Sequence, residues 1–185
     1  KVNFRVRRGE IHALVGENGA GKSTLMKILS GVYPTGDYSG TMLLNGKPQT
    51  YSCIKDSERA GVAIIYQELG LVNTMTVCEN IFLGNELMKN GCIDWDSQNE
   101  KSKELLQIVR LKENPMTVVE QLGTGKQQLI EIAKAINKNV QLLILDEPTS
   151  SLTEADSKNL LELLKKFRSE GMTCIYISHK LNEVM

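Results

Sequence analysis

Eight residues near the start of the chain have the types and the spacing needed to hold a phosphate. Residues 16–23 read Gly-Glu-Asn-Gly-Ala-Gly-Lys-Ser. Glycines let the backbone turn through conformations that are closed to other residues, so successive N–H groups can point at phosphate oxygens. In this pattern Lys22 reaches the β- and γ-phosphates of a nucleotide, and the Ser23 hydroxyl is a ligand for Mg²⁺. This segment, called the phosphate loop below, predicts nucleotide binding.

The stretches on either side supply the strand and the helix that the pattern requires. Residues 11–15 are an apolar run long enough for one buried strand, and residues 23–30 have the apolar spacing of a helix that ends at Gly31. A helix that begins at the loop adds the positive end of its dipole to the anion site. This context argues against the alternative, a glycine-rich turn with an incidental Lys-Ser.

Two adjacent carboxylates follow the strongest strand signal of the chain. Residues 142–145 are all apolar, which predicts a strand buried on both faces, and Asp146 and Glu147 come directly after it. Asp146 is a candidate Mg²⁺ ligand through the water shell of the ion, and Glu147 is a candidate base for the water that attacks the γ-phosphorus. The alternative is a solvated acidic turn, and the phosphate loop favours the catalytic interpretation.

Polar residues also follow two other predicted strands, where ligands usually bind in α/β sheets. Gln67 follows residues 62–66, and His179 follows the strand predicted at 173–177. On position alone, Gln67 could be an ordinary loop residue and His179 a structural histidine. Residues 122–126 open a helix that runs to about residue 137, and their glycines are either a second anion site or a flexible turn.

The remaining chain predicts a helical insertion and a small hairpin. Asn45-Gly46 is a tight-turn dipeptide after an apolar pair, and residues 76–121 contain no convincing strand. Alternating apolar residues at 2–6 predict a strand already under way at the first residue. We therefore expect the chain to be a piece of a longer protein.

Composition narrows the class of protein. The 185 residues are 41% hydrophobic, enough for a real core, and 22 basic residues balance 22 acidic ones. This balance argues against a nucleic-acid partner. The four cysteines lack metal-site spacing and fit reduced thiols in the cytosol.

Together, these motifs resemble those of the ABC-transporter ATPase domain in order and spacing: Walker A, Q-loop, signature, Walker B and H-loop. Five segments are most similar in sequence to bacterial monosaccharide importers of the xylose, ribose, galactose and multiple-sugar type: residues 16–24, 66–69, 79–84, 127–135 and 176–180. The resemblance covers essentially the whole chain. It implies an α/β fold: one ABC ATPase domain over 1–185, with a RecA-like parallel core, a small antiparallel part and a helical subdomain at about 76–137.

The resemblance also implies roles for residues. Glu147 is the general base, His179 contacts the γ-phosphate, and Gln67 approaches Mg²⁺ together with Ser23 and Asp146. The signature residues, which act on the ATP of a partner domain, are Gly123, Thr124, Gly125 and Lys126. The nucleotide-binding residues are Gly16, Glu17, Asn18, Gly19, Ala20, Gly21, Lys22, Ser23 and Thr24.

The implied assembly is a peripheral ATPase on the cytoplasmic face of the membrane. Its cofactors are ATP and Mg²⁺. Its partners are a second ABC ATPase domain in tandem in the same full-length chain, membrane permease subunits and, indirectly, a sugar-binding protein. The segment Leu-Gly-Thr-Gly-Lys at 122–126 departs from the usual Leu-Ser-Gly-Gly-Gln. This departure keeps a second hypothesis open, a regulatory or dimerisation half with weak turnover. A soluble ABC ATPase outside transport and a P-loop kinase fit the motifs less well.

Overall fold

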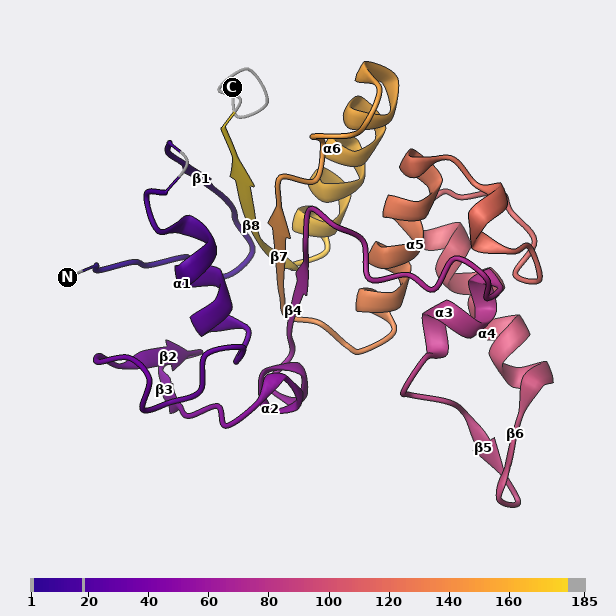
Figure 1. Cartoon of the computed structure of the whole chain (residues 1–185), viewed down its shortest axis with the longest axis horizontal. Helices are drawn as coiled ribbons and strands as arrows, with labels where there is room; N and C mark the ends of the chain where they lie inside the picture. Colours follow the sequence, from indigo (N-terminus) through magenta and orange to yellow (C-terminus); the bar gives the residue numbers. More distant parts are fainter. Residues whose placement is uncertain (1, 18, 180–185) are drawn as a thin grey trace. The chain divides into compact units, whose positions relative to one another are not determined.

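The computed structural model describes residues 2–17 and 19–179 (Figure 1). Strands and helices alternate along most of the chain. None of the helices among the described residues is both long and apolar enough to cross a membrane. The elements are β1 (Ile11–Val15), α1 (Lys22–Leu29), β2 (Met42–Leu44), β3 (Lys47–Gln49), α2 (Ile54–Arg59), β4 (Val62–Ile65), α3 (Val77–Phe82), β5 (Met88–Lys89), β6 (Cys92–Ile93), α4 (Trp95–Ile108), the 3₁₀ helix η1 (Val119–Gln121), α5 (Thr124–Ile136), β7 (Leu142–Asp146), α6 (Glu154–Ser169) and β8 (Thr173–Ser178).

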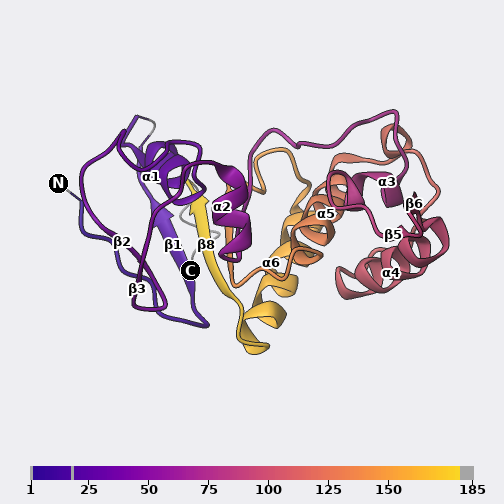
Figure 2. The same cartoon turned by 90° about the horizontal axis from the view of Figure 1, so that it is seen from below.

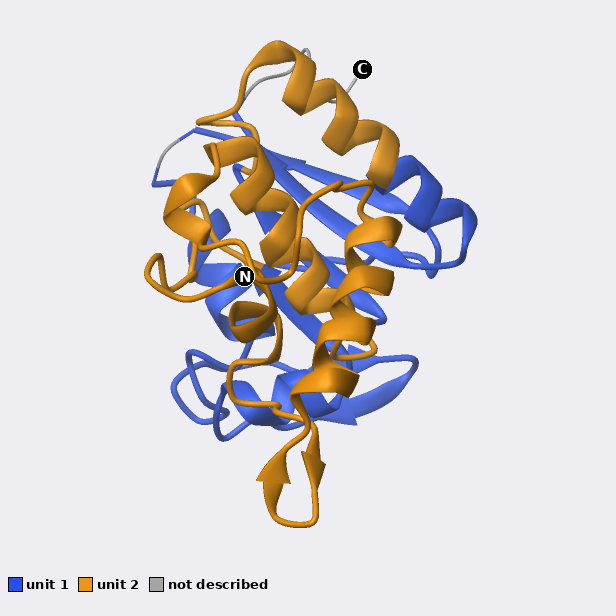
Figure 3. Cartoon of the chain, turned by 90° about the vertical axis from the view of Figure 1, so that its right-hand side faces the viewer, with its two compact units in different colours: residues 1–64, 140–147, 164–185 blue, residues 65–139, 148–163 orange. Residues whose placement is uncertain are grey.

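The chain forms two compact units (Figure 3). Unit 1 comprises residues 1–64, 140–147 and 164–185, and unit 2 comprises residues 65–139 and 148–163. The phosphate loop and the residues that follow β7 and β8 belong to unit 1. Gln67 and residues 122–126 belong to unit 2.

The main sheet has the strand order β1-β8-β7-β4. β8 is parallel to both neighbours, and Figure 2 shows β1 and β8 side by side from below. In this register Val15 pairs with Ser178 and Asp146 pairs with Ile177, so β1, β7 and β8 end at the same edge of the sheet. This arrangement confirms the predicted α/β class with a parallel sheet.

A compact apolar core holds α1 against the sheet. Met26 of α1 is fully buried with Val62, Ile144, Ile175 and Ile177 from three strands. At about 25 cal/mol per Å², burial of such side chains is the main force that fixes the start of α1 relative to the strand ends. The core therefore positions the phosphate loop, which connects β1 to α1.

Unit 2 is built around α3, which packs against α4 and α5. Its first turn is closed by a capping box: the Thr76 hydroxyl accepts from the backbone of Glu79, and the Glu79 carboxylate accepts from the backbone of Thr76. Both exchanges satisfy backbone donors that the helix itself leaves unpaired. Val77, Ile81 and Phe82 then lie buried on the inner side of this helix.

Two local predictions were wrong. Residues 76–121 contain a short hairpin, β5 and β6, whose turn at Asn90-Gly91 has positive φ angles of 54° and 82°. Asn-Gly favours such a turn, so the signal was present but the strands are only two residues long. Residues 2–6 form no strand, because no described segment pairs with them. The predicted hairpin around Asn45-Gly46 is confirmed as β2 and β3.

Candidate active site

The phosphate loop is shaped by two glycines with left-handed backbone. Gly19 has φ 83° and Gly21 has φ 90°, a region that residues with a Cβ rarely adopt. Gly21 is the N-cap of α1 and offers no side-chain cap, and the first turn of α1 carries no acidic residue. The N–H groups at this helix end are therefore available to an anion. Asn18, predicted to be part of this loop, lies outside the described residues.

The ammonium of Lys22 is held within the loop. Nζ donates to the carbonyl oxygen of Gly16 at 2.6 Å and to that of Glu17 at 2.9 Å. An ammonium has three N–H donors, so these two bonds leave one for a phosphate oxygen. The loop thus fixes the position of a positive charge while leaving it able to bind an anion.

Asp146 lies at the end of β7 and receives a hydrogen bond from the Ser23 hydroxyl. Burial is the main cause of a raised pKa for the Asp146 carboxyl, and the negative charge of Glu147 raises it further. The charges of Lys22 and Lys27 and the Ser23 hydrogen bond act in the opposite direction. Two crowded carboxyls beside a lysine are typical of a site that is completed by a cation.

The donors present fit Mg²⁺. The ion prefers oxygen ligands and usually takes one or two from the protein, with phosphates and waters completing its shell. The Ser23 hydroxyl and the Asp146 carboxylate supply two such oxygens side by side. The described residues contain no group of three or more His, Cys, Asp or Glu side chains that could hold a metal alone. The site is thus suited to a cation that arrives with a phosphate.

Glu147 and His179 are in contact. Oε1 of Glu147 lies 3.1 Å from Nδ1 of His179, and the carboxylate side chain is only 16% exposed. Glu147 adopts a left-handed φ of 46°, and its backbone N–H donates to the carbonyl of Ile177 at 3.0 Å. A positive φ outside glycine is uncommon and costs energy, so strand pairing has to hold the residue in place.

Unit 2 carries the other predicted site residues. Gln67 is exposed and comes two residues after the end of β4. Gly123 is the N-cap of α5, without a side-chain cap, and Thr124 is exposed in its first turn. Lys126 pairs with Glu113 at 2.6 Å.

A carboxylate lies against the first turn of α5. A Cβ added to Gly125 would be 2.7 Å from Cγ of Asp156, too close for any residue other than glycine without movement. Asp156 is held there by Thr153, whose hydroxyl donates to Oδ2 at 2.7 Å and accepts from the Asp156 backbone at 3.2 Å. Nothing in the sequence indicated the contact between Asp156 and Gly125.

The profile of the family described as "ABC transporter" matches residues 1–150. The chain belongs to the ABC transporter family. The matched range includes the phosphate loop and the acidic end of β7, whereas His179 lies beyond it.

The most similar ABC relatives include sugar-import proteins. The xylose import ATP-binding protein XylG of Moorella thermoacetica is 60% identical over 184 residues, which are 100% of this chain and 36% of that protein. The L-arabinose transport ATP-binding protein AraG of Geobacillus stearothermophilus is 58% identical over 183 residues, 99% of this chain and 36% of that protein. The chain thus spans about a third of the length of these curated relatives.

Solved structures of ABC proteins share the fold. The cbiO1 protein of Clostridium perfringens, part of an ABC transporter complex, superposes with a TM-score of 0.82 at 27% identity, over 99% of this chain and 72% of that one. An ATP-binding cassette in its ADP conformation gives 0.82 at 22% identity, over 99% of this chain and 75% of that one. The second likeness supports the ABC fold alone.

Sequence reasoning missed the polar side chains that support the motifs in this ABC chain. Asp156 beside Gly125 and the contact between Glu147 and His179 both join segments at least 30 residues apart. No short sequence motif marks either pair. Only the order of the strands and the packing of the helices bring them together.

Proposed function

We propose that this chain binds Mg-ATP at the phosphate loop and hydrolyses it. The observation that carries the proposal is the cluster at one edge of the main sheet, where the phosphate loop follows β1, Asp146 and Glu147 follow β7 and His179 follows β8. A positive charge, two oxygen ligands for a cation and a carboxylate suited to be a base are all supplied by unit 1. Mg²⁺, when bound, would neutralise charge on the β- and γ-phosphates.

In this proposal each residue has a separate task. Lys22 and the N–H groups at the start of α1 bind phosphate oxygens, and Ser23 and Asp146 face the cation. Glu147 accepts a proton from the attacking water, the water oxygen bonds to the γ-phosphorus, and the bond to the β–γ bridging oxygen breaks. His179 orients the carboxylate, which lies 3.1 Å from its Nδ1, and would contact the γ-phosphate. Phosphate and ADP are the products.

The second unit would serve a second ATP. We assign residues 76–137 to the helical subdomain and residues 123–126 to the signature, whose backbone donors at the start of α5 would contact the ATP of a partner ATPase domain. Gln67 would approach the Mg²⁺ of its own domain. A partner domain in tandem suits relatives that are almost three times as long as this chain.

The work done by hydrolysis is then import of a monosaccharide. XylG and AraG are named for xylose import and L-arabinose transport, and their identity with this chain is close to 60%. We therefore assign the chain to a pentose importer, peripheral to the cytoplasmic face of the membrane and bound to permease subunits. A sugar-binding protein would deliver the sugar to those subunits.

Uptake by the reconstituted transporter tests this assignment. The full-length protein with its permease subunits and binding protein, placed in vesicles, should accumulate labelled xylose or L-arabinose only when Mg-ATP is supplied on the ATPase side. Lys22→Ala should abolish this uptake. Turnover of ATP without uptake of either sugar would refute the pentose assignment and leave the ATPase assignment standing.

A further inference from the structure

One turn of α5 holds both backbone groups of Gly70. The carbonyl oxygen of Gly70 accepts a hydrogen bond from Nζ of Lys134 at 3.2 Å, and its backbone N–H hydrogen-bonds to the Glu131 carboxylate. Oε1 of Glu131 would lie 3.5 Å from a Cβ added at Gly70. Side chains three residues apart share one face of a helix, so Glu131 and Lys134 together bind the backbone of one residue, Gly70, in the segment that follows Gln67.

Glu131 is an unusual residue to bury on this face. Its side chain is 11% exposed, and that of Lys134 is 16% exposed. Burial raises the pKa of the Glu131 carboxyl, whereas the charge of Lys134, the Gly70 hydrogen bond and the charge of Lys138 lower it. Oε1 is 3.9 Å from Nζ of Lys134, beyond hydrogen-bond distance, and this oxygen has no hydrogen-bond partner within the described ranges. The buried charge therefore depends on Lys134 and Gly70.

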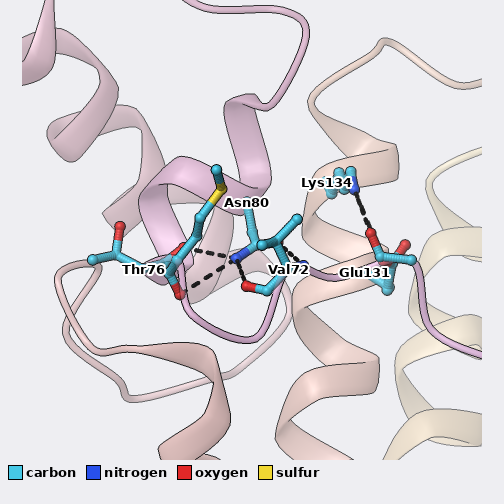
Figure 4. A network of polar contacts seen from close by, with 7 residues as sticks. Val72, Thr76, Asn80, Glu131 and Lys134 are labelled. Carbon is cyan, nitrogen blue, oxygen red and sulfur yellow. Dashed lines mark hydrogen bonds and ion pairs between the residues drawn. The ribbon is translucent and has the colours of Figure 1, made fainter.

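A second anchor holds the same segment two residues later (Figure 4). The buried side chain of Asn80, on α3, accepts from the backbone N–H of Val72 at 2.8 Å and donates to its carbonyl at 3.0 Å. It also donates to the carbonyl of Thr76 at 3.0 Å. Because α3 packs on α5, the segment after Gln67 is fixed to two helices that contact each other.

We propose that Glu131 and Lys134 are positioning residues that tie the segment after Gln67 to the helix on which the signature begins. Gly70 is three residues from Gln67, and Glu131 is seven residues, two helical turns, from Thr124. A displacement of Gln67 at one ATP would thus be transmitted to the signature end of α5, which acts at the other. The inference rests on the proposed function, in which Gln67 and the signature serve separate ATP molecules.

Variants of Glu131 in the full-length protein, assembled with its membrane subunits, test this connection between the segment after Gln67 and α5. Glu131→Ala removes both charge and acceptor, whereas Glu131→Gln keeps an acceptor for the Gly70 N–H. The matched control is Glu100→Gln on α4, because Glu100 forms an exposed ion pair with Lys103 at the same spacing of three residues. The two measurements are amide hydrogen exchange over residues 69–72 and the kcat and KM for ATP.

We expect Glu131→Ala to raise exchange at residues 69–72 about tenfold, the effect of losing one buried hydrogen bond. kcat should fall with little change in KM, since the phosphate loop still binds ATP. Glu131→Gln should restore most of both values, and Glu100→Gln should behave as wild type.

Two results would refute the positioning role of Glu131. One is unchanged exchange at residues 69–72 in Glu131→Ala. The other is an equal rise along the whole of α5 without a selective loss of kcat, which is the result of a merely structural role. Absence of turnover in the wild-type assembly would instead refute the proposed function, and the exchange pattern alone would then decide whether Glu131 fixes the segment.

Discussion

Oε1 of Glu147 lies 3.1 Å from Nδ1 of His179, at the ends of the neighbouring strands β7 and β8. The backbone N–H of Glu147 also donates to Ile177 of β8. The candidate base is therefore held from two sides by one strand. A carboxylate fixed in this way needs little reorganisation before it accepts a proton, which is the property that catalysis by positioned groups requires.

Loss of the histidine ring should slow hydrolysis more than it weakens binding. In the full-length assembly, His179→Ala should lower kcat for ATP about a hundredfold, the usual contribution of a positioned proton-transfer group, because the Glu147 carboxylate is no longer oriented. Steady-state turnover measures the effect. His12→Ala is the control, because Nδ1 of His12 is also 3.1 Å from a glutamate, Glu10, away from the proposed residues. Equal losses in the two variants would show that the effect is not specific to the site.

Lys22 should determine ATP affinity. Lys22→Ala removes a cation that is fixed by two loop carbonyls, and the loss of a charge-assisted bond to phosphate should weaken ATP binding by at least about tenfold. Equilibrium binding of a fluorescent ATP analogue to the full-length protein measures the change. Lys47→Ala, at an exposed lysine of β3, should bind as wild type. Unchanged binding in Lys22→Ala would place the phosphate elsewhere.

The sequence predicted a site best where the residues beside a motif also predict the strand or helix that positions it. The phosphate loop lies between a strand and a helix, and Asp146-Glu147 ends an apolar strand, so their place at the edge of a parallel sheet was predictable. Contacts that depend on strand order or helix packing were not. The Glu147–His179 pair needs β7 and β8 to be neighbours, and the grip on Gly70 needs α5 to pack against a loop more than 60 residues earlier in the chain.

Gly125 should tolerate alanine only when Asp156 is also removed. A methyl group at Gly125 would displace the Asp156 carboxylate and break its bond to Thr153, at a cost of about 1 kcal/mol in helix capping. Gly125→Ala should therefore increase hydrogen exchange at the start of α6. In the double variant Gly125→Ala/Asp156→Ala, hydrogen exchange at the start of α6 should equal that of Asp156→Ala alone. Strictly additive effects would contradict the contact.

Glu131 should make stability depend on pH. Burial raises the pKa of its carboxyl above the ordinary 4.5, so the folded state binds the proton more tightly than the unfolded state does. The free energy of unfolding should thus fall as pH rises from 4.5 through the raised pKa, while Lys134 and Lys138, the charges that face it, stay protonated. Glu131→Gln cannot titrate and should lose this part of the slope, whereas Glu100→Gln should keep it. Thermal unfolding of the full-length protein at a series of pH values measures the slope, and equal slopes in wild type and Glu131→Gln would contradict the assignment.

In the proposed function, unit 1 performs hydrolysis with Glu147 as the base. The most direct test is Mg-ATP turnover by the full-length protein with its membrane subunits, comparing wild type with Glu147→Gln at this position alone. We predict that Glu147→Gln binds ATP as tightly as wild type and loses turnover, because the amide keeps the shape of the side chain but cannot accept the proton. Undiminished turnover with ATP still bound at the phosphate loop would rule out Glu147 as the base and give this domain a regulatory role instead.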